Sequence, residues 1–89
     1  MIEDDYLLKI KTDLYQTRTK YRSLVLEAEK QGCLVSNLPN AGERLFAIKN
    51  ELSALLRNIA WLLDTQEKLN LQSEIAILLN AVYSAILSL

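Results

Sequence analysis

The chain has 89 residues, of which 51% are apolar and 24% charged, a composition typical of one globular domain and not of a disordered segment. Its formal net charge is −1, so it lacks the basic excess of proteins that follow nucleic-acid backbones, and we expect no nucleic-acid partner. With no histidine and one cysteine, the usual zinc sites and an internal disulfide are excluded, and the single thiol favours the reducing cytoplasm.

A first helix is expected over residues 4–31. Its core positions alternate in spacing between three and four residues, the pattern of a helix packed along one side. Thr17 is the one polar member, and its hydroxyl can bond the carbonyl one turn earlier. A break near residues 16–19, where two threonines lower helix propensity, would give four helices instead of three. The seam comprises Leu7, Ile10, Leu14, Thr17, Tyr21, Leu24 and Ala28.

The clearest interruption of the chain lies between residues 32 and 42, which hold both glycines and the only proline. Gly32 stands where a left-handed cap would end the first helix. The loop over residues 33–40 is too apolar for a free linker. We expect its Leu34, Val35 and Leu38 to cover one end of the bundle.

A second helix is expected over residues 41–63. Asn40 is the predicted N-cap, and Glu43 three residues later resembles the second half of a capping box. The seam of this helix repeats the alternate spacing of the first. Its members are Leu45, Ile48, Leu52, Leu55, Ile59 and Leu62.

A polar turn over residues 64–70 precedes a third helix over residues 71–88, for which Asn70 is favoured over Asp64 as N-cap. Three seams joined by short loops predict an all-α fold, an antiparallel up-down-up three-helix bundle that forms a single domain over residues 1–89. The third seam comprises Leu71, Ile75, Leu78, Val82, Ala85 and Leu89.

The third helix is too apolar for burial on one side. It carries no charge after Glu74, and it has Ile77, Tyr83 and Leu87 outside its seam. Either this helix is central to the core, or it packs against a second copy or a partner protein, which is the favoured reading. The uncharged stretch over residues 75–89 is shorter than the roughly 20 residues of a membrane span and is interrupted by polar residues.

Two further side chains are candidates for an interface. Trp61 lies outside the second seam, one turn after Arg57, and the two can stack as a cation–π pair typical of binding hot spots. Trp61 can equally be peripheral core. Tyr15 lies off the first seam and is a secondary candidate. The predicted interface therefore comprises Trp61, Arg57, Ile77, Tyr83, Leu87 and Tyr15.

Five basic residues form a cluster on the first helix between residues 9 and 22. They offer either a docking surface for an acidic partner or lipid headgroups, or an ordinary solvated face, and the second reading is favoured. The residues are Lys9, Lys11, Arg18, Lys20 and Arg22.

Catalysis is not expected. No histidine is present to act as a general base, no glycine-rich loop can cradle a phosphate, and Cys33 has no histidine partner to activate its thiol. We therefore expect a non-enzymatic protein–protein interaction module without cofactor or metal, of the chaperone, adaptor or regulator type. The expected partner is another protein or a second copy, in a homo-oligomer that is most simply a dimer. A membrane-surface module, peripheral at most, is an alternative.

The stretch from Arg57 to Val82 resembles the pediocin-like bacteriocin immunity proteins, which are small cytoplasmic antiparallel helical bundles. The resemblance rests on an apolar helix end, the segment over residues 65–71 and Glu74 at the start of an apolar helix. It requires a one-residue gap, leaves residues 1–56 unmatched and lacks the polar tail of that family. It implies an alternative function, the protection of a membrane target from a peptide toxin.

Overall fold

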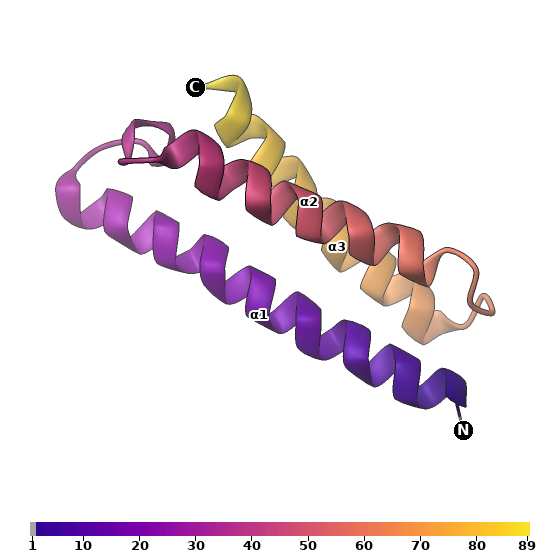
Figure 1. Cartoon of the computed structure of the whole chain (residues 1–89). Coiled ribbons are helices and arrows are strands. Elements are labelled where there is room, and N and C mark those ends of the chain that lie inside the picture. The colour runs from indigo at the N-terminus through magenta and orange to yellow at the C-terminus, as the bar shows by residue number, and fades with distance from the viewer. Residues whose placement is uncertain (1) are drawn as a thin grey trace.

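Three α-helices and one short 3-10 helix follow one another along the chain: α1 (Ile2–Gln31), η1 (Val35–Asn37), α2 (Ala41–Ile59) and α3 (Gln66–Leu87). The computed structural model describes the backbone of residues 2–89 and the side chains of residues 4–89. Successive helices run in opposite directions in an elongated bundle of 46 × 20 × 19 Å (Figure 1). The predicted all-α, three-helix bundle is confirmed, and the described range contains no strand.

α1 is one unbroken helix, so the four-helix alternative is wrong. The hydroxyls of Thr12, Thr17 and Thr19 each donate to the carbonyl oxygen four residues earlier, over 2.9 to 3.0 Å. These bonds satisfy the threonine side chains within the helix, which is why a threonine-rich stretch does not break it. The bond predicted for Thr17 is confirmed.

α1 ends as its sequence predicts. Gly32 has a φ of +64°, in the left-handed region that glycine enters without a steric penalty. The turn brings the Cys33 amide to within 3.0 Å of the Ala28 carbonyl oxygen, where it donates a hydrogen bond that caps the helix. The predicted glycine cap is confirmed.

α2 begins without the predicted capping box. Asn40 occupies the N-cap position, but it has a φ of 57°, and its side chain makes no capping hydrogen bond. Instead its carbonyl accepts the Arg44 amide at 3.0 Å, as the first bond of the helix. Asparagine tolerates the left-handed conformation better than most residues, so its backbone rather than its side chain starts the helix.

The turn between α2 and α3 lies earlier than predicted. α2 ends at Ile59 instead of residue 63, and α3 begins at Gln66 instead of residue 71. The N-cap of α3 is Thr65, whose hydroxyl accepts the Lys68 amide at 3.2 Å, so both Asn70 and Asp64 were wrong candidates. Thr65 lies within the predicted turn and has extended backbone, in which threonine is a favoured N-cap.

The core follows the predicted seams closely. All six members of the α2 seam are buried, and so is the α1 seam except for half-buried Tyr21. In α3, Leu71, Ile75 and Val82 are buried, whereas Leu89 is exposed. α3 is thus a side element with one buried face, and the alternative in which it forms the centre of the core is wrong.

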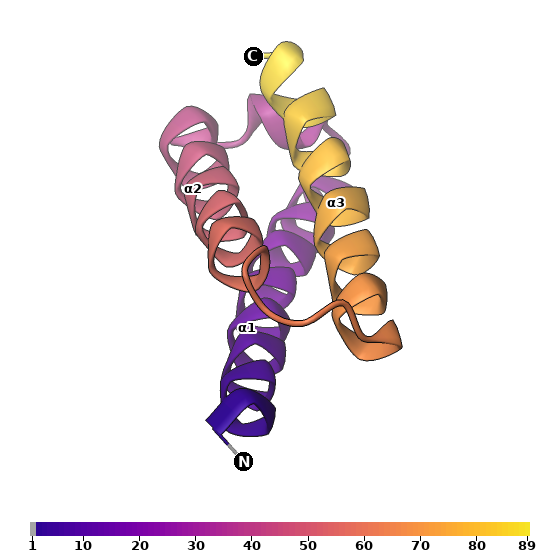
Figure 2. The same cartoon turned by 90° about the vertical axis from the view of Figure 1, so that its right-hand side faces the viewer.

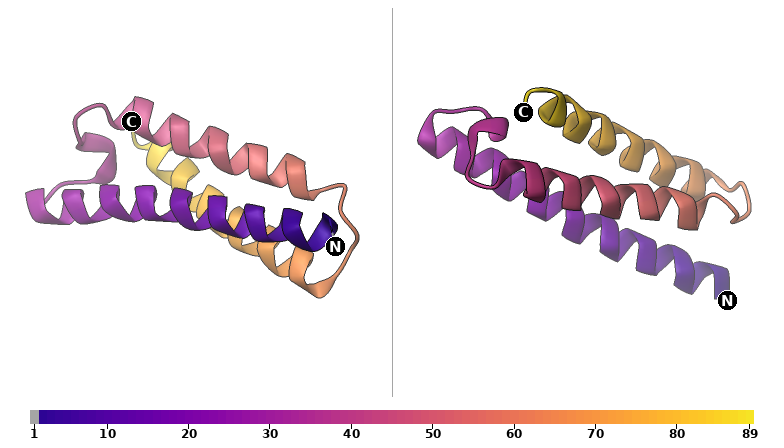
Figure 3. Two further views of the ribbon diagram at one scale, coloured as in Figure 1. Left: turned by 60° about the horizontal axis from the view of Figure 1, so that its bottom comes forward. Right: turned by 45° about the horizontal axis from the view of Figure 1, so that its top comes forward.

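The loop between α1 and α2 closes one end of the bundle. η1 packs against all three helices, and it lies where the C-terminal part of α3 has moved away from α1 (Figures 2 and 3). Leu38 is buried and Val35 is half-buried, as predicted, but Leu34 is exposed to solvent. Val35 and Leu38 therefore fill the space that α3 would occupy if it stayed beside α1 along its whole length.

A buried lysine joins α2 to α3. Lys68 is only 4% exposed, and its ammonium donates to the carbonyl oxygens of Ala60 at 3.0 Å and Leu62 at 2.7 Å. It also pairs with the Asp64 carboxylate at 2.7 Å. The cation thus satisfies carbonyls just past the C-terminal end of α2, where the helix dipole is negative. It holds the chain reversal that sets α3 against α2.

Replacing Lys68 with methionine keeps the length of the side chain but removes all three hydrogen bonds. We expect the free energy of unfolding to fall by roughly 2–3 kcal/mol, because buried carbonyls lose their donor. Urea denaturation followed by circular dichroism measures this loss. The matched control is Lys9→Met on the exposed surface of α1, expected to change stability by less than about 0.5 kcal/mol. Equal losses in the two variants would show that Lys68 has no structural role.

Candidate protein interface

The outer face of α3 lies opposite the residues that this helix buries in the core. Six residues, spaced alternately by four and three, are all exposed there and form a second seam that we call the outer stripe. None of them is charged, and no charge follows Glu74 anywhere in the helix. A helix of this kind has one apolar seam inside the bundle and another facing solvent. The outer stripe comprises Leu69, Ser73, Ala76, Asn80, Tyr83 and Leu87.

Three of the predicted interface residues belong to this face. Leu87 is 86% exposed and Tyr83 is 41% exposed, both within the outer stripe. Ile77, which is 70% exposed, follows Ala76 at the edge of the stripe. The structure therefore brings Tyr83 and Leu87 onto one face, whereas Ile77 lies about 80° around the helix from Leu87, beside Asn70, Glu74 and Ser84.

Trp61 lies apart from this surface. Because α2 ends at Ile59, the indole is in the turn after the helix, where it packs edge-to-face on Tyr6 with ring centroids 5.5 Å apart. The predicted cation–π pair with Arg57 is wrong, since Arg57 makes no ring contact among the described side chains. Trp61 stays 68% exposed, so its contact with Tyr6 does not make it core.

Tyr15 is also separate. It is exposed on the side of α1 that faces away from the bundle, in line with Leu8 and Leu26. The six predicted residues therefore fall into three places: the outer face of α3, the α2–α3 turn and the outer face of α1. Arg57 itself is exposed near the end of α2.

Three basic residues of the α1 cluster are engaged within the bundle. Lys11 pairs with Glu67, and Arg18 pairs with Glu74 at 3.7 Å. Both partners lie on α3 with the same seven-residue spacing, as parallel helices in register require. Lys20 pairs in the same way with α2. These cations attach α1 to its neighbours, so they do not form a free docking surface.

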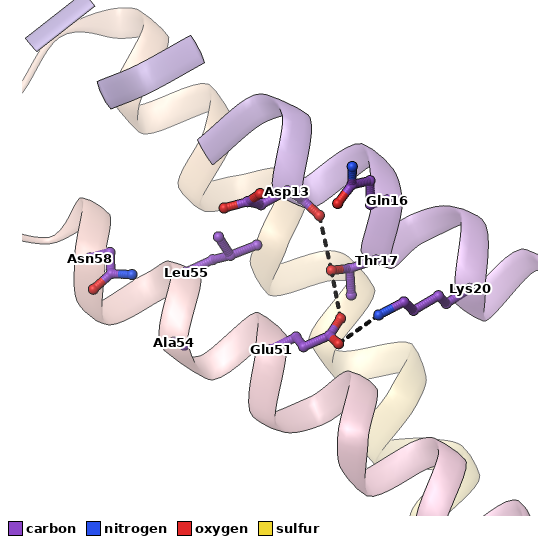
Figure 4. Close-up of a pocket in the computed structure, with 8 residues that line it drawn as sticks. All are labelled: Asp13, Gln16, Thr17, Lys20, Glu51, Ala54, Leu55 and Asn58. Atoms are coloured by element: carbon purple, nitrogen blue, oxygen red, sulfur yellow. Dashed lines mark hydrogen bonds and ion pairs between the residues drawn. The ribbon is translucent and has the colours of Figure 1, made fainter. Parts of the chain in front are cut away.

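A polar groove runs between α1 and α2 (Figure 4). Its cavity of about 310 Å³ is lined partly by Asp13, Thr17, Lys20 and Glu51. One oxygen of the Glu51 carboxylate accepts a hydrogen bond from the Lys20 ammonium at 2.7 Å. The other oxygen and the Asp13 carbonyl oxygen each lie 2.9 Å from the Thr17 hydroxyl, which shares its one proton between them. Sequence reasoning identified Thr17 as the polar seam residue but did not identify Glu51. The available signal was that Glu51 directly precedes Leu52, a seam residue of α2.

The pKa of Glu51 lies below its ordinary value of 4.5. Desolvation by partial burial raises the pKa, but hydrogen bonds from Lys20 and Thr17 and the charge of Lys20 outweigh it. The groove thus holds an ionised carboxylate whose bonds are already made by the protein. Such a site joins two helices.

Comparison of the chain with models of known protein families, with curated proteins and with solved structures gave no match. Within residues 2–89, none of the helices has the length and apolar character needed to cross a bilayer. In the same range, acidic and thiol side chains do not gather in a group able to hold a metal ion.

The lowered pKa of Glu51 predicts a pH-dependent stability. A depressed folded-state pKa stabilises the protein above the unfolded value and loses this effect as the pH falls through the folded-state value. We expect Glu51→Gln to be less stable than the original chain at pH 7. The two should converge at pH values well below 4.5. Urea denaturation across pH 2–7 tests this. In Glu43→Gln, the matched control at an exposed position of α2, no comparable convergence is expected.

Proposed function

We propose that this chain is a non-enzymatic protein-interaction module that packs the outer face of α3 against another protein chain. The observation that supports this is the exposure of Leu69, Tyr83 and Leu87 on an uncharged face of a helix whose opposite face already fills the core. Such a module acts as an adaptor, a chaperone or a regulator. The cytoplasm is its proposed compartment.

The physical reason is the cost of leaving this face in water. Burial stabilises by about 25 cal/mol for each Å² of apolar surface removed from solvent. Single exposed leucines are ordinary, but a contiguous apolar patch marks a binding surface. Tyr83 and Leu87 lie about one turn apart on one face of the helix, so a single partner helix can cover both, with Ile77 at the side of that contact.

The membrane-surface alternative is less well supported. Helices that lie on membranes combine an apolar face with lysines and arginines that meet the lipid headgroups. α3 has no basic residue after Lys68, and the ammonium of Lys68 is buried. Lys11 and Arg18 of α1 are paired with α3 itself. These ion pairs favour a protein partner over a lipid surface.

The proposal is tested by placing a photo-crosslinking amino acid at Ile77 in cells of the native host. We expect a discrete adduct of defined mass, whose protein is identified by mass spectrometry. The matched control carries the same group at Leu8, which is similarly exposed on the outer face of α1. Adducts from neither position, or equally from both, would contradict the proposed surface.

A charge within the face should abolish the interaction. In Leu87→Asp the new carboxylate would have to lose its water on binding, so the adduct formed at position 77 is expected to fall at least tenfold. Because Leu87 is 86% exposed, the helical circular dichroism and the thermal midpoint should change little. Leu26→Asp, near the end of α1, is the matched control and should leave the adduct intact. An unfolded Leu87→Asp variant would instead assign Leu87 to the core.

A further inference from the structure

We propose that the partner covering the outer face of α3 is a second copy of this chain, with the two α3 helices antiparallel about a two-fold axis near residue 78. This inference rests on the proposed function and names the occupant of the same surface. Two-fold dimers join identical patches, so the surface has to be complementary to itself.

The outer stripe has the spacing that a helix pair requires. Its six residues, from Leu69 to Leu87, follow one another at intervals of four, three, four, three and four. This is the pattern of the core positions in a two-stranded coiled coil. The buried seam of α3 has the same spacing on the opposite side, and it is already used by the bundle.

Antiparallel pairing matches the side chains by size. Positions equally distant from residue 78 come together, so Leu69 meets Leu87 of the other copy, and Ser73 meets Tyr83. Ala76 meets Asn80 next to the axis. Each bulky aromatic ring is thus placed against a small residue, as interdigitating layers require. Parallel pairing would instead stack the two Tyr83 rings and place the two Asn80 amides in one layer.

The residues beside the axis complete the contact. Ile77 lies on one flank of the central layers, and because the two-fold axis keeps that flank on the same side in both copies, it would approach Ile77 of the other copy. The small side chain of Ala76 lets the helix backbones approach closely. Asn80 is the polar residue nearest the axis, and one polar core residue of this kind sets the register of a helix pair.

Charge favours a second copy over a charged partner. Between residues 75 and 87 the helix has no ionisable group except the Tyr83 phenol, so two copies bring no like charges together. Glu67 and Glu74 are held on the side of α3 that faces α1, where Lys11 and Arg18 pair with them. In the antiparallel arrangement the two helix dipoles also oppose each other, which is their favourable orientation.

The buried area sets the expected strength. Leu69, Ile77, Tyr83 and Leu87 are between 41% and 86% exposed. At roughly 150–200 Å² for each fully exposed side chain, a dimer removes about 1,000 Å² in total with the small residues included. Specific interfaces begin near 1,200 Å². The dimer is therefore expected to be weak and to dissociate reversibly on dilution.

The experiment uses the full chain with Cys33→Ser, into which either Leu69→Cys or Leu87→Cys is introduced. In the antiparallel dimer the two new thiols lie opposite each other, so an equimolar mixture should form a mixed disulfide on mild oxidation. Each variant alone should crosslink little, because its two copies of the new thiol lie roughly 27 Å apart along the axis. Sedimentation over a hundredfold concentration range measures the dimer, and circular dichroism confirms that both variants remain helical.

Two results would overturn the inference. A disulfide formed by Leu87→Cys alone would show parallel pairing. A monomer at every concentration would exclude the second copy. In the second case, a photo-adduct from position 77 with a different protein would preserve the proposed function, whereas no adduct would refute both.

Discussion

α3 has two apolar seams, and a three-helix bundle has room to bury only one of them. The buried seam, through Leu71, Ile75 and Val82, joins α3 to the common core. The other seam faces water because no fourth element lies over it within residues 2–89. A fourth helix would complete the packing, and the proposed partner is the physical equivalent of that helix. The proposed site of interaction therefore follows from the number of helices, not from any catalytic group.

The charged residues play a different part, because they hold the helices together around this core. α1 is attached to α3 through Lys11 and Arg18 and to α2 through Lys20. Each pair is largely exposed, so each contributes only up to about 1 kcal/mol, and their common register matters more than their strength. Lys68 differs, since its buried ammonium donates hydrogen bonds to the backbone carbonyls of Ala60 and Leu62. Removing this donor would leave carbonyl groups without a partner, which costs more than the loss of an exposed ion pair.

Sequence reasoning predicted the helices and their core faces better than their ends. Heptad spacing depends on which side of a helix is buried, and that signal is repeated along each helix. Helix ends depend on single capping bonds, so Thr65 was missed and Asn40 was given a capping role that its side chain does not have. The early end of α2 also displaced Trp61, which packs on Tyr6 instead of Arg57. Nothing local to Lys68 showed that its charge would be buried.

The three helices, the glycine cap and the seams could be predicted from the sequence, because each depends on residues close together along the chain. The sequence also showed that α3 is apolar on more than one side. Only the tertiary structure decided which of these sides is buried and which meets solvent, because that depends on where α1 and α2 lie. The packing likewise pairs Lys11, Arg18 and Lys20 of α1 within the bundle and places η1 in the gap beside α3, since these contacts join segments far apart in the chain.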